Sequence, residues 1–125
     1  MSFTEEQILK NKNILIVIEN GIIGLDIRKQ LDGYGYNTKI INLSNGDKIE
    51  DALKKGFQLM IIEKKMGGEG AAQAVELARK YNLPTIYLST ENEPLDLEKH
   101  GFRILMMPFG EDDLKEIVRM ALGDN

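Results

Sequence analysis

The stretch from Phe57 to Met66, Phe-Gln-Leu-Met-Ile-Ile-Glu-Lys-Lys-Met, holds the apolar run that decides the fold. Four consecutive apolar residues, Leu59 to Ile62, lead directly into Glu63, and a glycine-rich turn begins at Gly67. A short apolar run bounded by turn residues is typical of a strand buried on both faces of a parallel sheet. Open α/β sheets place their functional groups just past the carboxyl ends of such strands. The sequence therefore predicts that Glu63 stands at a functional edge.

Comparable apolar runs recur along the chain and alternate with amphipathic segments. Strands are expected at about 13–18, 36–43, 57–62, 83–88 and 103–107. Helices are expected at about 22–34, between the turn at 44–47 and Gly56, at about 69–81 and 95–100, and from the start at 110–113 to about 122. Strictly alternating strands and helices predict a doubly wound, five-stranded parallel sheet with helices on both faces, a three-layer α/β sandwich. We expect residues 1–12 to be an N-terminal lead, 13–122 to form one domain, and 123–125 to be a C-terminal tail.

Composition excludes several classes of function. The 125 residues suit a single domain, and 42% hydrophobic with 29% charged residues is ordinary for a soluble globular protein. A formal charge of −4 argues against nucleic acid as a partner. Without cysteine there is no disulfide, thiolate metal site or thiol catalysis. No segment is apolar enough for a membrane span or a signal peptide, so a cytoplasmic location is expected.

Three stretches carry a family likeness. They are Asn-Ile-Leu-Ile-Val-Ile-Glu-Asn-Gly-Ile-Ile-Gly-Leu-Asp-Ile at 13–27, Leu-Pro-Thr-Ile-Tyr-Leu-Ser-Thr at 83–90 and Ile-Leu-Met-Met-Pro-Phe at 104–109. In order and spacing, residues 12–122 resemble a response-regulator receiver domain of the CheY-like superfamily. The resemblance implies a flavodoxin-like (βα)5 fold and a role in a two-component phosphorelay. Receivers accept a phosphoryl group from a histidine kinase onto an aspartate after the third strand.

The resemblance maps the phosphorylation site of this family onto residues that depart from its pattern. The acidic pair that binds magnesium falls on Ile18 and Glu19. The phosphoacceptor aspartate falls on Glu63, and the residue that gives a backbone carbonyl to the metal falls on Lys65. One carboxylate of the metal site is thus replaced by an isoleucine, and the acceptor is one methylene longer.

The positions that respond to phosphorylation in receivers depart as well. The switch hydroxyl falls on Ser89, which fits the family pattern. The switch aromatic falls on Ile104, and the lysine that grips the phosphoryl oxygens falls on Met107. Methionine is a flexible gap-filler, so Met106 and Met107 are both expected in the core.

These departures bear on phosphoryl transfer, which depends mainly on positioning and charge stabilisation. The extra methylene of Glu63 displaces the attacking oxygen by roughly an ångström, and such an error can cost about 100-fold in rate. Magnesium demands near-ideal octahedral geometry, and Met107 supplies no cation. We therefore expect a degenerate receiver, or pseudo-receiver, that is not an enzyme, has no catalytic residue and needs no cofactor. Glu19 and Glu63 remain weak metal candidates.

The leading hypothesis is a protein-interaction module in which Glu63 acts as a built-in charge. Its partner would be a histidine kinase or an output domain, bound on the face formed by residues 95–100, 103–107 and the last helix. A homodimer is left open. The alternative is a divergent but active phosphoacceptor in which Glu63 and Glu19 hold a divalent metal, the one case that requires magnesium. A third reading is a flavodoxin-like binder of small ligands that uses the glycine turn at 67–70.

Overall fold

The computed structural model describes residues 12–18, 21–42, 49–63, 69–89, 102–107 and 109–123, with backbone alone at 21–23, 69–72, 89 and 111. The strands are β1 (Asn13–Ile18), β2 (Asn37–Asn42), β3 (Leu59–Glu63), β4 (Thr85–Ser89) and β5 (Arg103–Met106). The helices are α2 (Gly21–Gly33), α3 (Ile49–Leu53), α4 (Glu69–Lys80) and α6 (Glu111–Ala121). The helix expected at 95–100 lies outside the described residues.

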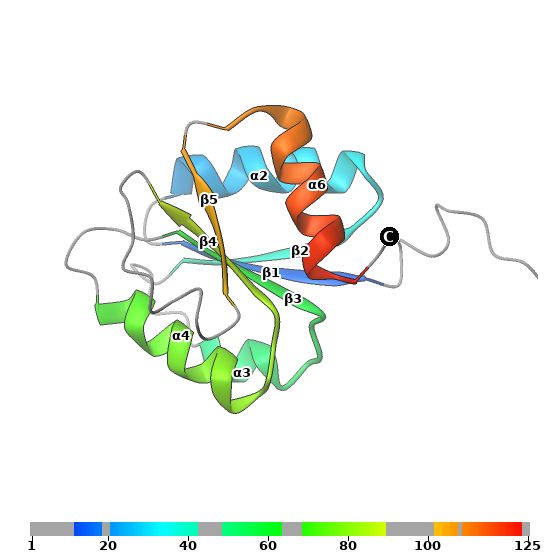
Figure 1. The fold of residues 1–125 in the computed structure, drawn as a ribbon. Helices are drawn as coiled ribbons and strands as arrows, with labels where there is room; N and C mark the ends of the chain where they lie inside the picture. The colour runs from blue at the N-terminus through cyan, green and yellow to red at the C-terminus, as the bar shows by residue number, and fades with distance from the viewer. Residues whose placement is uncertain are drawn as a thin grey trace, which may run out of the picture.

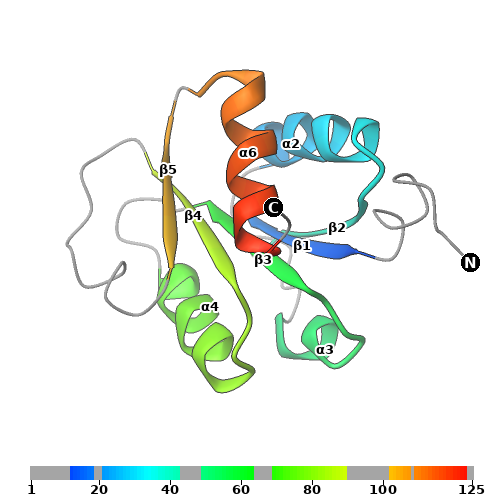
Figure 2. The same ribbon diagram turned by 45° about the vertical axis from the view of Figure 1, so that its right-hand side comes forward.

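The strands form one parallel sheet in the order β2-β1-β3-β4-β5. Helices α2 and α6 cover one face, and α3 and α4 cover the other (Figures 1 and 2). This is the strand order of flavodoxin-like folds, in which right-handed crossovers reverse direction at β1. The predicted doubly wound α/β sandwich is confirmed.

The core is divided by the sheet into two clusters, because successive side chains of a strand point to opposite faces. On β1, Ile14, Ile16 and Ile18 join the cluster under α2 and α6, whereas Leu15 and Val17 join the one under α3 and α4. All residues of Leu59–Ile62 on β3 are buried. The prediction of a strand buried on both faces is therefore confirmed.

Three details differ from expectation. Strand β4 begins at Thr85 rather than at position 83, because Pro84 lacks an N–H and joins the sheet only through its carbonyl, which accepts a hydrogen bond from the Met60 amide at 3.0 Å. Met106 is 41% exposed, so its assignment to the core was wrong; Met107, one residue on, packs against the cluster under α2 and α6.

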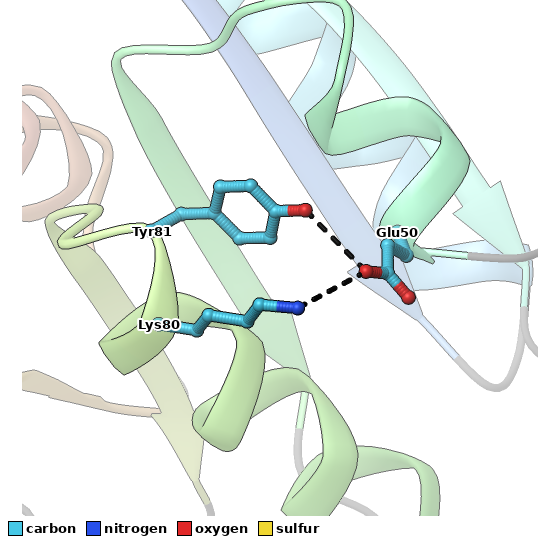
Figure 3. A network of polar contacts seen from close by, with 3 residues as sticks. All are labelled: Glu50, Lys80 and Tyr81. Atoms are coloured by element: carbon cyan, nitrogen blue, oxygen red, sulfur yellow. Dashed lines mark hydrogen bonds and ion pairs between the residues drawn. The ribbon is translucent and has the colours of Figure 1, made fainter.

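Tyr81 is the third difference, since the sequence predicts a helix over 69–81 and α4 ends at Lys80. Its side chain is 39% exposed. Its hydroxyl donates to Glu50 Oε1 on α3 at 3.4 Å, and Lys80 Nζ approaches the same oxygen at 3.4 Å (Figure 3). The end of α4 is thereby linked to α3 at the surface.

Helix α2 ends in a Schellman motif, with the Gly35 amide bonded to the Asp32 carbonyl and the Tyr36 amide to the Leu31 carbonyl. Gly35 has φ of 97°, a conformation that L side chains rarely adopt. The glycine at this position therefore turns the chain from α2 into β2. In the part of the chain that the structure describes, no helix is long and apolar enough to cross a membrane.

Candidate functional site

Glu63 is the last residue of β3, at the carboxyl end of a central strand. Leu59 and Ile61 belong to the cluster under α2 and α6, so strand alternation directs Glu63 to the same face. The side chain is half-buried, and its Oε2 atom is shielded from solvent. The carboxylate therefore stands where the sequence predicted it, at the edge where this class of fold keeps its chemistry.

The neighbours of Glu63 on the adjacent strands are apolar. Glu63 pairs in register with Leu88 of β4, which is fully buried. On the other side Val17 pairs with Ile62, so one further step of the same register brings Ile18 beside Glu63. Ile18 is 1% exposed and belongs to the same cluster as Leu88. The floor of this edge is thus built from hydrocarbon on both sides of the carboxylate.

Ile18 is enclosed by a glycine of α2. A Cβ built on Gly24 would lie 2.6 Å from Ile18 Cδ1 and 3.2 Å from Ile18 Cγ2. Real Cβ atoms essentially never show a contact as short as the first of these. The helix backbone therefore lies directly on the isoleucine, at the position where the family pattern has a metal-binding carboxylate.

The described residues of this edge supply only part of the magnesium site of the receivers that the sequence resembles. Magnesium takes oxygen ligands at near-octahedral positions. Of Ile18, Glu63 and Met107, which lie at or just past the ends of β1, β3 and β5, only Glu63 has a carboxylate. Within the described residues, no group of three or more His, Cys, Asp or Glu side chains could hold a metal ion.

The structure describes only some of the other site residues that the sequence predicts. Glu19 and Lys65 lie outside the described residues. Ser89 is the last residue of β4, and its backbone pairs in register with Met106 of β5. Ile104 is half-buried and packs against the cluster under α3 and α4, on the opposite face from Leu105. Met107 packs against the same cluster as Ile18.

Two contributors to this edge escaped the sequence analysis. No signal in the sequence distinguishes Leu88 from other strand residues. The strand register shows that it is the neighbour of Glu63. Gly24 left a weak signal, since an isolated glycine within a helical pattern often has a packing reason. Its partner Ile18 could be found only from the docking of α2 on the sheet.

Comparison with known proteins supports the fold. No family model matches the sequence, and no curated protein matches it. Among solved structures, a response regulator receiver protein from Burkholderia phymatum superposes with a TM-score of 0.76 at 19% identity, covering 92% of this chain and 98% of that one. The chemotaxis protein CheY4 of Vibrio cholerae gives a TM-score of 0.73 at 19% identity, covering 88% and 98%. A two-component response regulator from Clostridium difficile gives 0.73 at 18% identity, covering 90% and 97%.

This chain aligns with nearly the whole length of each of these three structures, so the likeness extends over their complete domains. The chain has the fold of response-regulator receiver domains. The identities to all three structures are 18–19%, so the likeness defines the architecture and leaves the chemistry to the residues of the site.

Proposed function

We propose that this chain is a receiver-like module of a two-component signalling pathway that works through protein–protein contacts rather than through phosphorylation of its own carboxylate. The receiver fold supports the signalling class. The observation that carries the loss of phosphotransfer is the contact between Ile18 and Gly24, because hydrocarbon fills the position of a metal ligand and helix backbone closes over it. On this proposal the protein is not an enzyme, requires no cofactor and acts in the cytoplasm.

The charge balance at the site supports the same proposal. Phosphoryl transfer requires cations that neutralise the developing negative charge on the transferred group. Met107 packs into the core where the family pattern has a lysine, and Ile18 removes one anchor of the metal. Glu63 then acts as a constant charge on the strand end. A single carboxylate carries less charge than a phosphoryl group, so this built-in signal is weaker than phosphorylation.

A groove between β5 and α6 is the proposed partner surface. It has a volume of about 510 Å³ and is lined by apolar side chains such as Ile104, Ile117 and Met120 together with Arg103 and Glu116. Met120 is 51% exposed. Apolar contacts ringed by charges of both signs suit a polar-rimmed interface with a histidine kinase or an output domain, and the same surface on two copies would give a homodimer.

The deciding experiment is incubation with magnesium and beryllofluoride, or with acetyl phosphate, monitored by NMR and intact mass. We expect no added phosphoryl mass and no metal-dependent shift of the amides around Glu63 and Ser89. A modified Glu63 would instead establish the alternative, a divergent phosphoacceptor that uses Glu63 with a divalent metal. A typical receiver domain treated in parallel controls for the activity of the reagents.

A further inference from the structure

A second cavity lies at the amino-terminal edge of the sheet, where β4 and β5 begin and α4 and α6 end. Its volume is about 490 Å³. The described walls come from the end of α4 (Ala78, Arg79), the turn before β4 (82–84), Phe102 and Arg103 before and in β5, and Ala121 of α6. Glu63 ends β3 at the opposite, carboxyl-terminal edge. Phe102 and Arg103 also line the proposed partner groove, whereas Arg79 and the segment 82–85 line this cavity and not the groove.

The charge of the cavity is opposite to that of the chain. Arg79 and Arg103 both line it and are exposed, and no carboxylate occurs among its described lining residues. Neither guanidinium forms an ion pair with any residue that the structure describes. The chain carries a formal charge of −4, so two unpaired arginines in one hollow form a local positive site.

The ends of α4 and α6 reduce this potential without reversing it. A helix C-terminus presents about half an elementary negative charge, and two such ends meet two full positive charges here. Stabilising a helix end needs only one basic residue in its last turn, and α4 also has Lys80, whose Nζ instead approaches Glu50 Oε1. Arg103 begins a strand and has no helix end of its own to stabilise.

One wall of the cavity is formed where α4 ends in a Schellman motif. The Asn82 amide donates to the Arg79 carbonyl at 3.1 Å, and the Leu83 amide donates to the Ala78 carbonyl at 2.8 Å. Asn82 has φ of 52°, the left-handed conformation that this motif requires. The buried Thr85 hydroxyl donates to the Leu83 carbonyl at 3.0 Å, which fixes the start of β4.

We propose that this cavity binds an organic phosphate, a phosphate monoester joined to a compact apolar body. Guanidinium groups bind phosphate in bidentate pairs, and a monoester near its dianionic state matches two of them. The cavity volume falls within the range of small-molecule sites, roughly 300–1,000 Å³, and exceeds what a lone phosphate needs. Leu83, Pro84 and Phe102 supply apolar wall for the remainder of the ligand.

The test is to titrate the intact chain with phenyl phosphate, inorganic phosphate and benzoate. Binding is measured by calorimetry and by the NMR shifts of residues 78–85 and 102–103. Phenyl phosphate should bind at least about tenfold more tightly than either comparison ligand, because inorganic phosphate lacks the apolar body and benzoate carries a single negative charge on two oxygens. Arg79→Gln and Arg103→Gln should each weaken its binding by about 10- to 100-fold, as expected for a lost charged hydrogen bond. Arg119→Gln, which removes an arginine that does not line the cavity, should leave it unchanged.

Three results would overturn the proposal: no saturation below about 10 mM phenyl phosphate, equal affinity for inorganic phosphate, or equal loss in all three arginine variants. Circular dichroism of each variant checks that the exposed substitutions leave the fold intact. The beryllofluoride experiment probes the opposite edge of the sheet, so its result and that of the phosphate titration can differ. Arg103 also lines the proposed partner groove, so Arg79→Gln is the variant that tests this cavity alone.

Discussion

Gly24 in α2 and Ile18 in β1 are in contact so close that a Cβ on the glycine would lie 2.6 Å from Ile18 Cδ1. This contact seals the end of β1 with hydrocarbon at the position where the receiver pattern has a carboxylate. It joins the fold to the proposed function, since a side chain at position 24 would require Ile18 or the helix to shift.

Gly24→Ala should destabilise the protein. Overpacking a buried contact costs about 1–3 kcal/mol, which exceeds the gain of up to about 1 kcal/mol from replacing a helical glycine by alanine. Urea unfolding followed by circular dichroism measures the difference. Gly33→Ala is the matched control, because no atom lies within 4 Å of the Cβ it would add, and it should be neutral or stabilising.

Ile18→Val in the Gly24→Ala background should recover part of the loss, since valine lacks the Cδ1 atom that the new methyl group meets. A double-mutant cycle gives the coupling between the two positions. Strictly additive effects would contradict the proposed direct contact.

Ile18→Asp should destabilise the protein by several kcal/mol, because an ionised carboxylate would enter a site that is 1% exposed and surrounded by hydrocarbon. The measurement is the midpoint of urea unfolding, with Ile18→Leu as an apolar control that costs less than about 1.5 kcal/mol. A fully tolerated aspartate would mean that the end of β1 can open to solvent, contrary to the packing against Gly24.

The triple change of Ile18→Asp, Glu63→Asp and Met107→Lys rebuilds the acidic and basic groups of the receiver pattern. We expect magnesium to raise the melting temperature of this variant and not that of Glu63→Asp alone, because a metal that binds only the folded state stabilises it. If magnesium leaves the triple variant unaffected, the site has diverged beyond these three positions.

Gly35→Ala should cost about 1–2 kcal/mol, the penalty of holding an L residue in a left-handed conformation. Gly35 has φ of 97° and forms the turn between α2 and β2. The same unfolding experiment measures the loss. Gly33→Ala again serves as the comparison, two residues earlier and without a positive φ, and equal effects at both positions would refute the conformational explanation.

Glu50→Ala should change stability by less than about 1 kcal/mol, although Glu50 meets both Lys80 and Tyr81 in Figure 3. The contacts are 3.4 Å long and lie at the surface, where water competes for each group. Leu53→Ala on the same helix is the contrast: this side chain is buried, and its loss should cost about 2–5 kcal/mol. Thermal unfolding of the two variants tests the ranking.

The alternation of elements and the burial of β1 and β3 were predictable from the sequence, because strand and helix periods are local properties of the chain. The position of Glu63 at a strand end followed in the same way. The residue types alone show that Ile18 and Met107 carry no charge.

Other features depended on how distant segments pack. The two neighbouring methionines differ in burial, because successive side chains of an extended chain point to opposite sides. Met107 packs against the cluster under α2 and α6, whereas Met106 is 41% exposed. The contact of Gly24 with Ile18 depends on where α2 docks on the sheet. Arg79 and Arg103 line one cavity only because α4 ends beside the start of β5. The periodicity of a strand or helix depends on residues that are close in the sequence. The distance between two packed elements depends on side chains that come into contact only in the folded chain.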